Sequence, residues 1–112
     1  MFKILSPGKF ISSSWKNGGG ITREIARSHP GDDWVWRISI AEVTTDGPFS
    51  KFDGMSRILT VIEGKGVDLK SSDGVIAARL LKPVFFSGET DILSNLVNGE
   101  IKDLNIIFDH TK

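Results

Sequence analysis

The sequence has no cysteine and only two histidines, His29 and His110. Without cysteine the chain can form no disulfide, no cysteine-bound zinc site and no thiol nucleophile, which fits a reducing compartment. His29 lies in the turn-like stretch SHPGDD and His110 in the terminal tail, so neither has a second metal ligand at the usual spacing. We therefore expect no metal, no cofactor and no catalytic residue of the histidine-dependent kind.

The sequence also lacks an excess of either charge and any long hydrophobic run. Fourteen Lys and Arg balance fourteen Asp and Glu, and the basic residues are scattered singly along the chain. This pattern argues against nucleic acid and against anionic membranes as partners. No apolar run approaches the roughly 20 residues that span a bilayer, and the opening MFKILSPGKF has too short an apolar segment for a signal peptide. We expect a cytoplasmic protein, and its 112 residues predict one domain, residues 1–112.

Turn residues are abundant, and they separate short runs of β-branched and aromatic residues. The clearest run, residues 34–43, alternates Trp and Ile with smaller or polar residues, which predicts a strand with one strongly apolar face. Similar runs predict strands at 2–5, 21–26, 57–63, 66–70, 75–81, 83–87 and 103–109. Eight short strands joined by short turns indicate an all-β antiparallel barrel or sandwich.

Two stretches near the C-terminus carry further expectations. The stretch TDILSNLVNG, residues 90–99, has the pattern of a helix of at most two turns, with Asp91 at its start and Gly99 at its end. The predicted strand at 103–109 is followed only by HTK, so nothing in the chain covers its edge. This favours pairing of that edge with a second copy of the chain in a homodimer.

Three consecutive glycines stand in the stretch WKNGGGITRE, residues 15–24. One interpretation is a bulge or wide turn that needs positive φ angles and no ligand. The other is a close approach of backbone N–H groups to a carboxylate or phosphate, with Asn17 and Thr22 adding side-chain hydrogen bonds. Nucleotide-binding motifs do not fit, because the third glycine of G-x-G-x-x-G would fall at Arg23.

Polar residues alternate along several of the predicted strands, so their side chains share a face. If those faces line a common interior they form a polar pocket, in which Arg37 and Arg57 would anchor a carboxylate through paired hydrogen bonds. Glu24 or Asp103 could orient the two guanidinium groups, or these charges could pair with one another or lie on a solvated sheet face. The predicted ligand-binding residues are Asn17, Gly19, Gly20, Thr22, Glu24, Arg37, Ser39, Arg57, Asp103 and Asn105.

The loop DGPFSKFDG, residues 46–54, places two phenylalanines three residues apart. Phe49 and Phe52 could plug the mouth of a barrel or pin the loop to the core, and we favour pinning. Three functional classes stay open: a small-molecule binding protein, a metal-free enzyme with Glu24 as acid or base, and an interaction module that exposes Phe49 and Phe52. We expect binding rather than catalysis.

Five segments, taken together and in order, resemble the HutD/Ves family of bacterial cupin-like proteins. They are WKNGGGITREIA, WRISIAEV, DGPFSKFDGMSRILTVIEGKG, FSG and NGEIKDLNI. The resemblance implies a cupin-like, RmlC-like jelly-roll antiparallel β-barrel. It also implies a regulatory protein of histidine utilisation or of a stress response, which binds a small carboxylate metabolite such as formylglutamate.

Two differences from related families bear on that expectation. Metal-binding cupins use a His-x-His pair, a Glu and a later His, whereas the corresponding stretch FDGMSRILTVIEGKG contains no histidine. Metal-independent binding is therefore expected. HutD/Ves proteins typically continue into a second β-rich half, so by this comparison the chain is a short or truncated member.

Overall fold

Every regular element that the structure describes is a β-strand. The computed structural model describes residues 3–4, 11–15, 18–29, 33–109 and 111. The strands are β1 (Lys3–Ile4), β2 (Ile11–Ser14), β3 (Gly20–Arg27), β4 (Trp36–Val43), β5 (Gly47–Pro48), β6 (Ser56–Glu63), β7 (Val67–Ser71), β8 (Gly74–Ala78), β9 (Val84–Ser87), β10 (Leu93–Leu96) and β11 (Ile101–Phe108). The all-β prediction is confirmed. Within these residues there is no helix that could cross a membrane.

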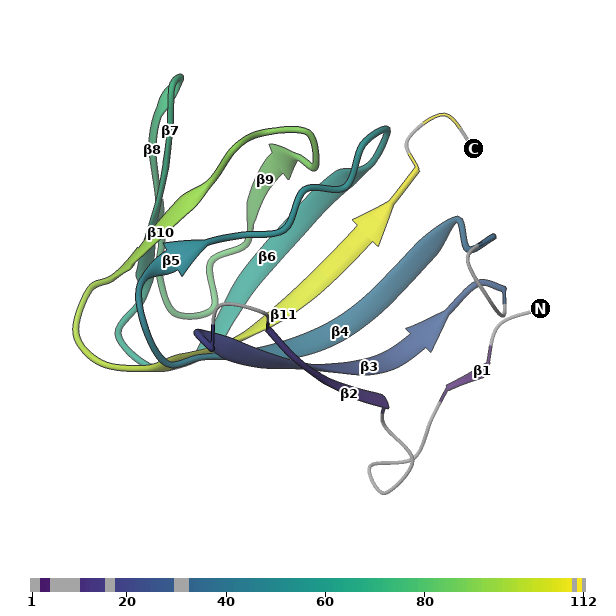
Figure 1. Ribbon diagram of the computed structural model, residues 1–112, viewed down its shortest axis with the longest axis horizontal. Coiled ribbons are helices and arrows are strands. Elements are labelled where there is room, and N and C mark those ends of the chain that lie inside the picture. Colours follow the sequence, from purple (N-terminus) through teal and green to yellow (C-terminus); the bar gives the residue numbers. More distant parts are fainter. Residues whose placement is uncertain (1–2, 5–10, 16–17, 30–32, 110, 112) are drawn as a thin grey trace.

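The strands form two antiparallel sheets that face each other (Figure 1). The larger sheet has the order β1-β3-β4-β11-β6-β9, with β2 also paired to β3, and the smaller has the order β5-β10-β7-β8. Outside the named strands, the described residues form one further pairing, a parallel bridge between Val61 of β6 and Leu80. The two sheets otherwise hydrogen-bond as separate ladders, so closure into one continuous barrel is not confirmed.

The hydrophobic core lies where the small sheet packs on the large one. Leu59 and Val61 of β6 and Val67 and Leu69 of β7 are completely buried. Full burial of such a side chain contributes roughly 1.5–3 kcal/mol. Farther along the inner face of the large sheet the residues are polar, and a cavity lies over them.

The more hydrophobic face of β4 would be expected to point inward, but in the structure its other face does. Ser39, Ala41 and Val43 are buried on the inner side, whereas Trp36 and Ile38 are half-buried on the outer side. The strand alternates as predicted, but the polar and small residues point into the molecule. An interior that contains a polar cavity makes this orientation favourable, because the polar side chains can be paired there.

Strand β11 is not an edge strand, so that expectation was wrong. It lies in the middle of the large sheet, paired along its length with β4 on one side and β6 on the other (Figure 1). The last strand of the sequence is inserted between two earlier ones, which chain order alone does not reveal. With both of its edges paired, β11 offers no edge to a second copy of the chain in a homodimer.

The helix expected at residues 90–99 is also wrong, because this stretch contains the strand β10. Ile92 and Ser94 are buried and Leu93 is exposed, which is the period of two of a strand. Pairing with β7 satisfies the backbone, and the Asp46 carboxylate accepts hydrogen bonds from the Leu96 N–H (2.7 Å) and from a neighbouring amide side chain. Pairing with residues far away in the sequence thus decides the structure of this stretch, against its local helix-like pattern.

Candidate functional site

A cavity of about 560 Å³ lies on the polar part of the large sheet's inner face. The segment between β5 and β6 runs above the sheet and forms the opposite wall (Figure 1). Its volume falls within the range of about 300–1,000 Å³ that is typical of small-molecule sites. The lining residues are Ser13, Ser14, Trp15, Thr22, Glu24, Arg27, Arg37, Ser39, Ala41, Pro48, Phe49, Ser50, Phe52, Arg57, Asp103, Asn105 and Ile107.

Most of the residues predicted as ligand contacts are brought together here. Seven of them line the cavity, from four neighbouring strands: Thr22 and Glu24, Arg37 and Ser39, Arg57, and Asp103 and Asn105. Asn17 lies outside the described residues. Gly19 and Gly20 are buried but do not line the cavity.

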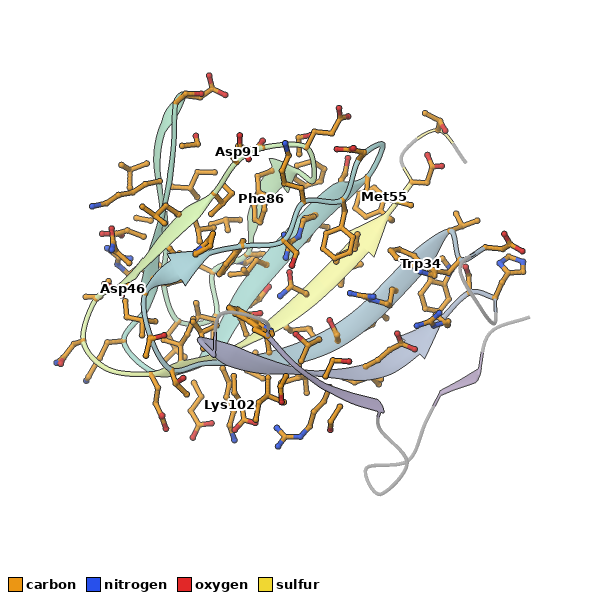
Figure 2. The ribbon with its side chains drawn as sticks, viewed as in Figure 1. Trp34, Asp46, Met55, Phe86, Asp91 and Lys102 are labelled. Carbon is orange, nitrogen blue, oxygen red and sulfur yellow. The ribbon has the colours of Figure 1, made fainter. Side chains whose placement is uncertain are left out.

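Arg57 is held at the buried end of the cavity by aromatic rings. Its side chain carbon Cζ lies 5.7, 5.2 and 5.1 Å from the ring centres of Phe49, Phe52 and Phe86, respectively. Cation–π attraction of this kind contributes roughly 0.5–2 kcal/mol per well-placed ring. Phe86, labelled in Figure 2, belongs to β9 and packs against this guanidinium.

Arg57 is 6% exposed, yet no carboxylate lies within ion-pair distance of it among the described residues. Its guanidinium donates to the Ser50 carbonyl (3.1 Å) and to Asn105 Oδ1 (2.9 Å), and its buried Nε has no partner. Burial lowers the pKa of Arg57 to about 10, while the charge of Asp103 opposes that change. The site therefore contains a buried cation whose direct contacts among the described residues are all with neutral groups.

Asp103 is the second buried charge-bearing group of this region, with an exposed fraction of zero. Its Oδ1 accepts a hydrogen bond from the Asn105 amide, and its buried Oδ2 has no partner. Burial raises the pKa of Asp103 to about 7, against the opposing effects of Arg57 and the Asn105 hydrogen bond. Asn105 thus links Arg57 to Asp103 without letting the two charges touch.

At the other end of the cavity Glu24 is paired with Arg27. The Arg27 Nε donates to Glu24 Oε2 at 2.7 Å, and its Nη2 donates to Oε1. The Nε of Arg37 lies 3.8 Å from the same Oε1. Burial lowers the pKa of Arg37, with Glu24 opposing and Arg27 reinforcing that change. Glu24 therefore faces the cavity, as its proposed acid–base role would require, with its charge compensated.

Sequence reasoning missed Arg27, and a β-bulge explains why. The pairing of β3 with β4 shifts register between Glu24 and Ala26, so that Glu24 lies opposite Ser39 and Arg27 lies opposite Arg37. Simple alternation would put residues 24 and 27 on opposite faces, but the extra residue in the bulge restores them to the same side. No local signal in the sequence marks this bulge.

Phe52 connects the two ends of the cavity. The Cζ of Arg37 lies 5.1 Å from the centre of the Trp34 ring and 5.3 Å from that of Phe52, which also contacts Arg57. Trp34, labelled in Figure 2, lies two residues before the start of β4. A single ring is thus shared by both guanidinium groups.

The loop that carries the two phenylalanines is fastened to the body of the protein. The Phe52 N–H donates to the Gly88 carbonyl (2.6 Å), and the Gly88 N–H donates to the Met55 carbonyl (2.8 Å). Phe49 is 8% exposed and packs edge-on against Trp15. The interaction-module hypothesis required an exposed aromatic patch, and Phe49 and Phe52 do not form one.

The glycine run positions Trp15 rather than lining the cavity. The Trp15 N–H donates to the Gly20 carbonyl (2.9 Å), and Gly18, with φ of +74°, donates back to the Trp15 carbonyl (3.0 Å). The Trp15 indole N–H then donates to Thr22 Oγ1 (2.8 Å). A Cβ on Gly20 would lie 2.5 Å from the Glu42 carbonyl oxygen and 3.0 Å from the indole.

We expect Gly20→Ala to lower the free energy of unfolding by roughly 1–3 kcal/mol, because the added methyl overlaps a backbone carbonyl in a packed site. Gly18→Ala is the matched control: nothing lies within 4 Å of its added Cβ, so only the positive φ opposes it, at a cost of about 1 kcal/mol. Urea unfolding of the two variants measures both changes. Equal stability of Gly20→Ala and wild type would contradict this packing of Trp15.

The cavity residues do not fit a metal ion. Among the described residues, no histidine lines the cavity and no group of three or more His, Asp or Glu could hold a metal. The two carboxylates of the cavity are each engaged with neighbouring amide or guanidinium groups. The chemistry available here is that of guanidinium groups, a buried carboxyl and aromatic rings.

Comparison with known proteins identifies relatives along most of the chain. The HutD family model matches residues 8–112. An uncharacterised 21.2 kDa protein in the hutC 3′ region of Pseudomonas putida is 45% identical over 110 residues, which are 95% of this chain and 57% of that protein. Protein Ves of Escherichia fergusonii is 41% identical over 96 residues, which are 83% of this chain and 50% of that protein.

Solved structures show the same relationship and the fold. HutD from Pseudomonas fluorescens SBW25, recorded under a formate condition, has a TM-score of 0.86 and 33% identity over 98% of this chain and 61% of that chain. KdgF from Halomonas sp. has a TM-score of 0.70 at 8% identity over 96% of this chain and 94% of that chain, which shows a common cupin-like fold. The chain spans between half and about three fifths of the length of its HutD and Ves relatives. On the match to residues 8–112, the chain belongs to the HutD family.

Proposed function

We propose that this protein binds a small carboxylate metabolite in the cavity, without a metal ion, and acts as a regulatory binding protein. The observation that carries the proposal is Arg57, a buried cation that faces the cavity and that no anionic group of the described residues contacts. Leaving a cation buried and uncompensated is costly, and an anionic ligand would remove that cost.

The arrangement of donors suits a carboxylate. Arg57 and Arg37 each keep a buried Nε without a hydrogen-bond partner, and both guanidinium groups are held against aromatic rings. A guanidinium in a fixed orientation can bind a carboxylate through two parallel hydrogen bonds, which are stronger than hydrogen bonds between neutral groups. Phe52 and Trp15 offer apolar surface to the remainder of such a ligand.

The regulatory role and the pathway rest on the relatives. One relative is a protein of a hutC 3′ region and another is named HutD, which supports a role in histidine utilisation. The expected ligand is a small acid of the formylglutamate type. Because the chain spans only part of the length of these relatives, the function of the whole protein is itself part of the proposal.

We expect Arg37→Met to weaken the binding of N-formyl-L-glutamate about 10- to 100-fold, because charge-assisted hydrogen bonds contribute roughly 1.5–3 kcal/mol. Met retains contact with the rings of Trp34 and Phe52, so the variant should fold. Arg23→Met is the matched control, since Arg23 pairs with Glu42 and does not line the cavity.

The measurement is thermal unfolding with and without N-formyl-L-glutamate, urocanate, glutamate and formate. A ligand at about 100 times its dissociation constant stabilises the folded state by roughly 2.7 kcal/mol, which raises the melting temperature of a domain of this size by several degrees. Equal shifts in wild type, Arg37→Met and Arg23→Met would exclude this cavity as the binding site.

A further inference from the structure

The carboxyl group of Asp103 stands out because it shares the proposed site yet carries the same charge as the proposed ligand. It lies on the wall of the cavity, is completely buried, and leaves Oδ2 with no partner. If Asp103 were ionised, an incoming carboxylate would place a second negative charge in the same poorly solvated space. Two such charges close together are strongly unfavourable.

We propose that the cavity binds its anion together with one proton, which the carboxyl of Asp103 holds on Oδ2. This inference rests on the function proposed above and specifies how the same site is regulated. The neutral carboxyl adds no charge to the cavity and supplies an O–H donor where the structure shows an acceptor without a partner.

The hydrogen-bond chain explains why ligand and proton are coupled. Arg57 donates to Asn105 Oδ1, and the Asn105 amide donates to Asp103 Oδ1. Arg57 is the cation whose charge favours ionisation of Asp103, and burial has the opposite and larger effect on the pKa of Asp103. A carboxylate bound to Arg57 offsets that positive charge, so the affinity of Asp103 for a proton rises further. By linkage, the proton raises the affinity for the anion by the same factor.

The other charged groups around the cavity do not remove the coupling between anion binding and protonation of Asp103. Strand β6 contributes Arg57, β4 contributes Arg37, and β3 contributes Glu24 with Arg27. Glu24 is paired with Arg27 and lies near Arg37, so its charge is compensated locally. Within the described residues no other charged side chain lines the cavity. The lining residues from β2 and from the segment between β5 and β6 are all uncharged. Asp103 is thus the cavity carboxyl that no cation of the described residues contacts.

The test is calorimetric titration of the full chain with N-formyl-L-glutamate at pH 6, 7 and 8, each in two buffers of different ionisation enthalpy. Both carboxyl groups of this probe stay ionised above about pH 6. We expect the dissociation constant to rise about tenfold from pH 6 to pH 8, because the binding-competent protonated fraction falls by that factor. Proton uptake should increase toward one per bound ligand at pH 8 and be close to zero at pH 6.

Two variants separate Asp103 from other carboxylates. Asp103→Asn imitates the protonated group, so at pH 8 it should bind with the affinity that wild type has at pH 6 and take up no proton. Glu63→Gln is the matched control, because Glu63 is exposed, pairs with Lys102 and does not line this cavity. It should show the pH dependence of wild type.

The outcomes distinguish this inference from the function on which it rests. Binding with equal affinity at pH 6 and pH 8 and no proton uptake would refute the coupling of the anion to a proton and leave the small-anion function standing. No binding at any pH, to this probe or to formate, glutamate or urocanate, would refute both. A carboxyl carbon NMR titration of the free protein adds a test without ligand: a midpoint near 7 supports the inference, and one near 4 overturns it.

Discussion

Asp103→Asn is expected to stabilise the folded protein by on the order of 4 kcal/mol at pH 8 and to leave its stability nearly unchanged at pH 4. The carboxyl ionises near pH 4 in the unfolded chain but near pH 7 in the folded protein, because burial disfavours the charged form. Between these values the folded state holds the extra proton, so the stability of wild type falls as pH rises. Above about pH 7 the full cost of the buried charge is present.

Asparagine removes that cost and keeps the local geometry. Its side-chain oxygen can still accept from the Asn105 amide, and its NH2 group occupies the place of the Oδ2 that has no partner. Urea unfolding of wild type and variant at pH 4, 6 and 8 gives the difference between them, in which other titrating groups cancel. A difference that is constant with pH would show that Asp103 is ionised across this range in the folded protein.

Much of the strand pattern was predictable because side-chain alternation is a local property. The predicted runs 21–26, 57–63 and 103–109 fall within β3, β6 and β11 or differ from them by a residue or two. The strands β2 and β10 were missed, since ISSS has little β-propensity and residues 92–96 mix buried and exposed apolar groups. Their pairing with β3 and β7 decides their structure.

Which face of a strand points inward was less predictable. On β4 the large apolar residues lie outside, and Arg37 and Ser39 point to the cavity, so hydrophobicity alone indicates the wrong face. The polar residues were nevertheless assigned to a common pocket, because they were grouped by chemistry and parity. Arg27 escaped this reasoning because a bulge changes the parity of β3 between it and Glu24.

The glycine run shows a different limit of prediction from sequence. Its permissive backbone indicated close approach, and the structure does show one at Gly20, but the neighbours are the Glu42 carbonyl and the Trp15 indole. A glycine in the sequence can indicate that a side chain would not fit at that position. It does not indicate which atoms occupy the space. The neighbours of Gly20 come from β4 and from the residue before the turn, and only the fold brings them together.

Arg57→Met is expected to weaken the binding of N-formyl-L-glutamate by about 100-fold or more, a larger loss than for Arg37→Met. Arg57 is more deeply buried than Arg37, and a hydrogen bond to a charged group is stronger where water is excluded. Two charge-assisted hydrogen bonds would be lost together with the positive charge that attracts the ligand.

The folded state should tolerate this change. Met can pack against Phe49, Phe52 and Phe86, and removal of a buried charge offsets the loss of the Asn105 hydrogen bond. Arg57→Lys is the informative companion, because it keeps the charge and loses the planar pair of donors. Calorimetry should rank the affinities wild type, Arg57→Lys, Arg57→Met. Equal affinity of Lys and Arg at this position would mean that charge alone is recognised, and full binding by the Met variant would place the ligand elsewhere.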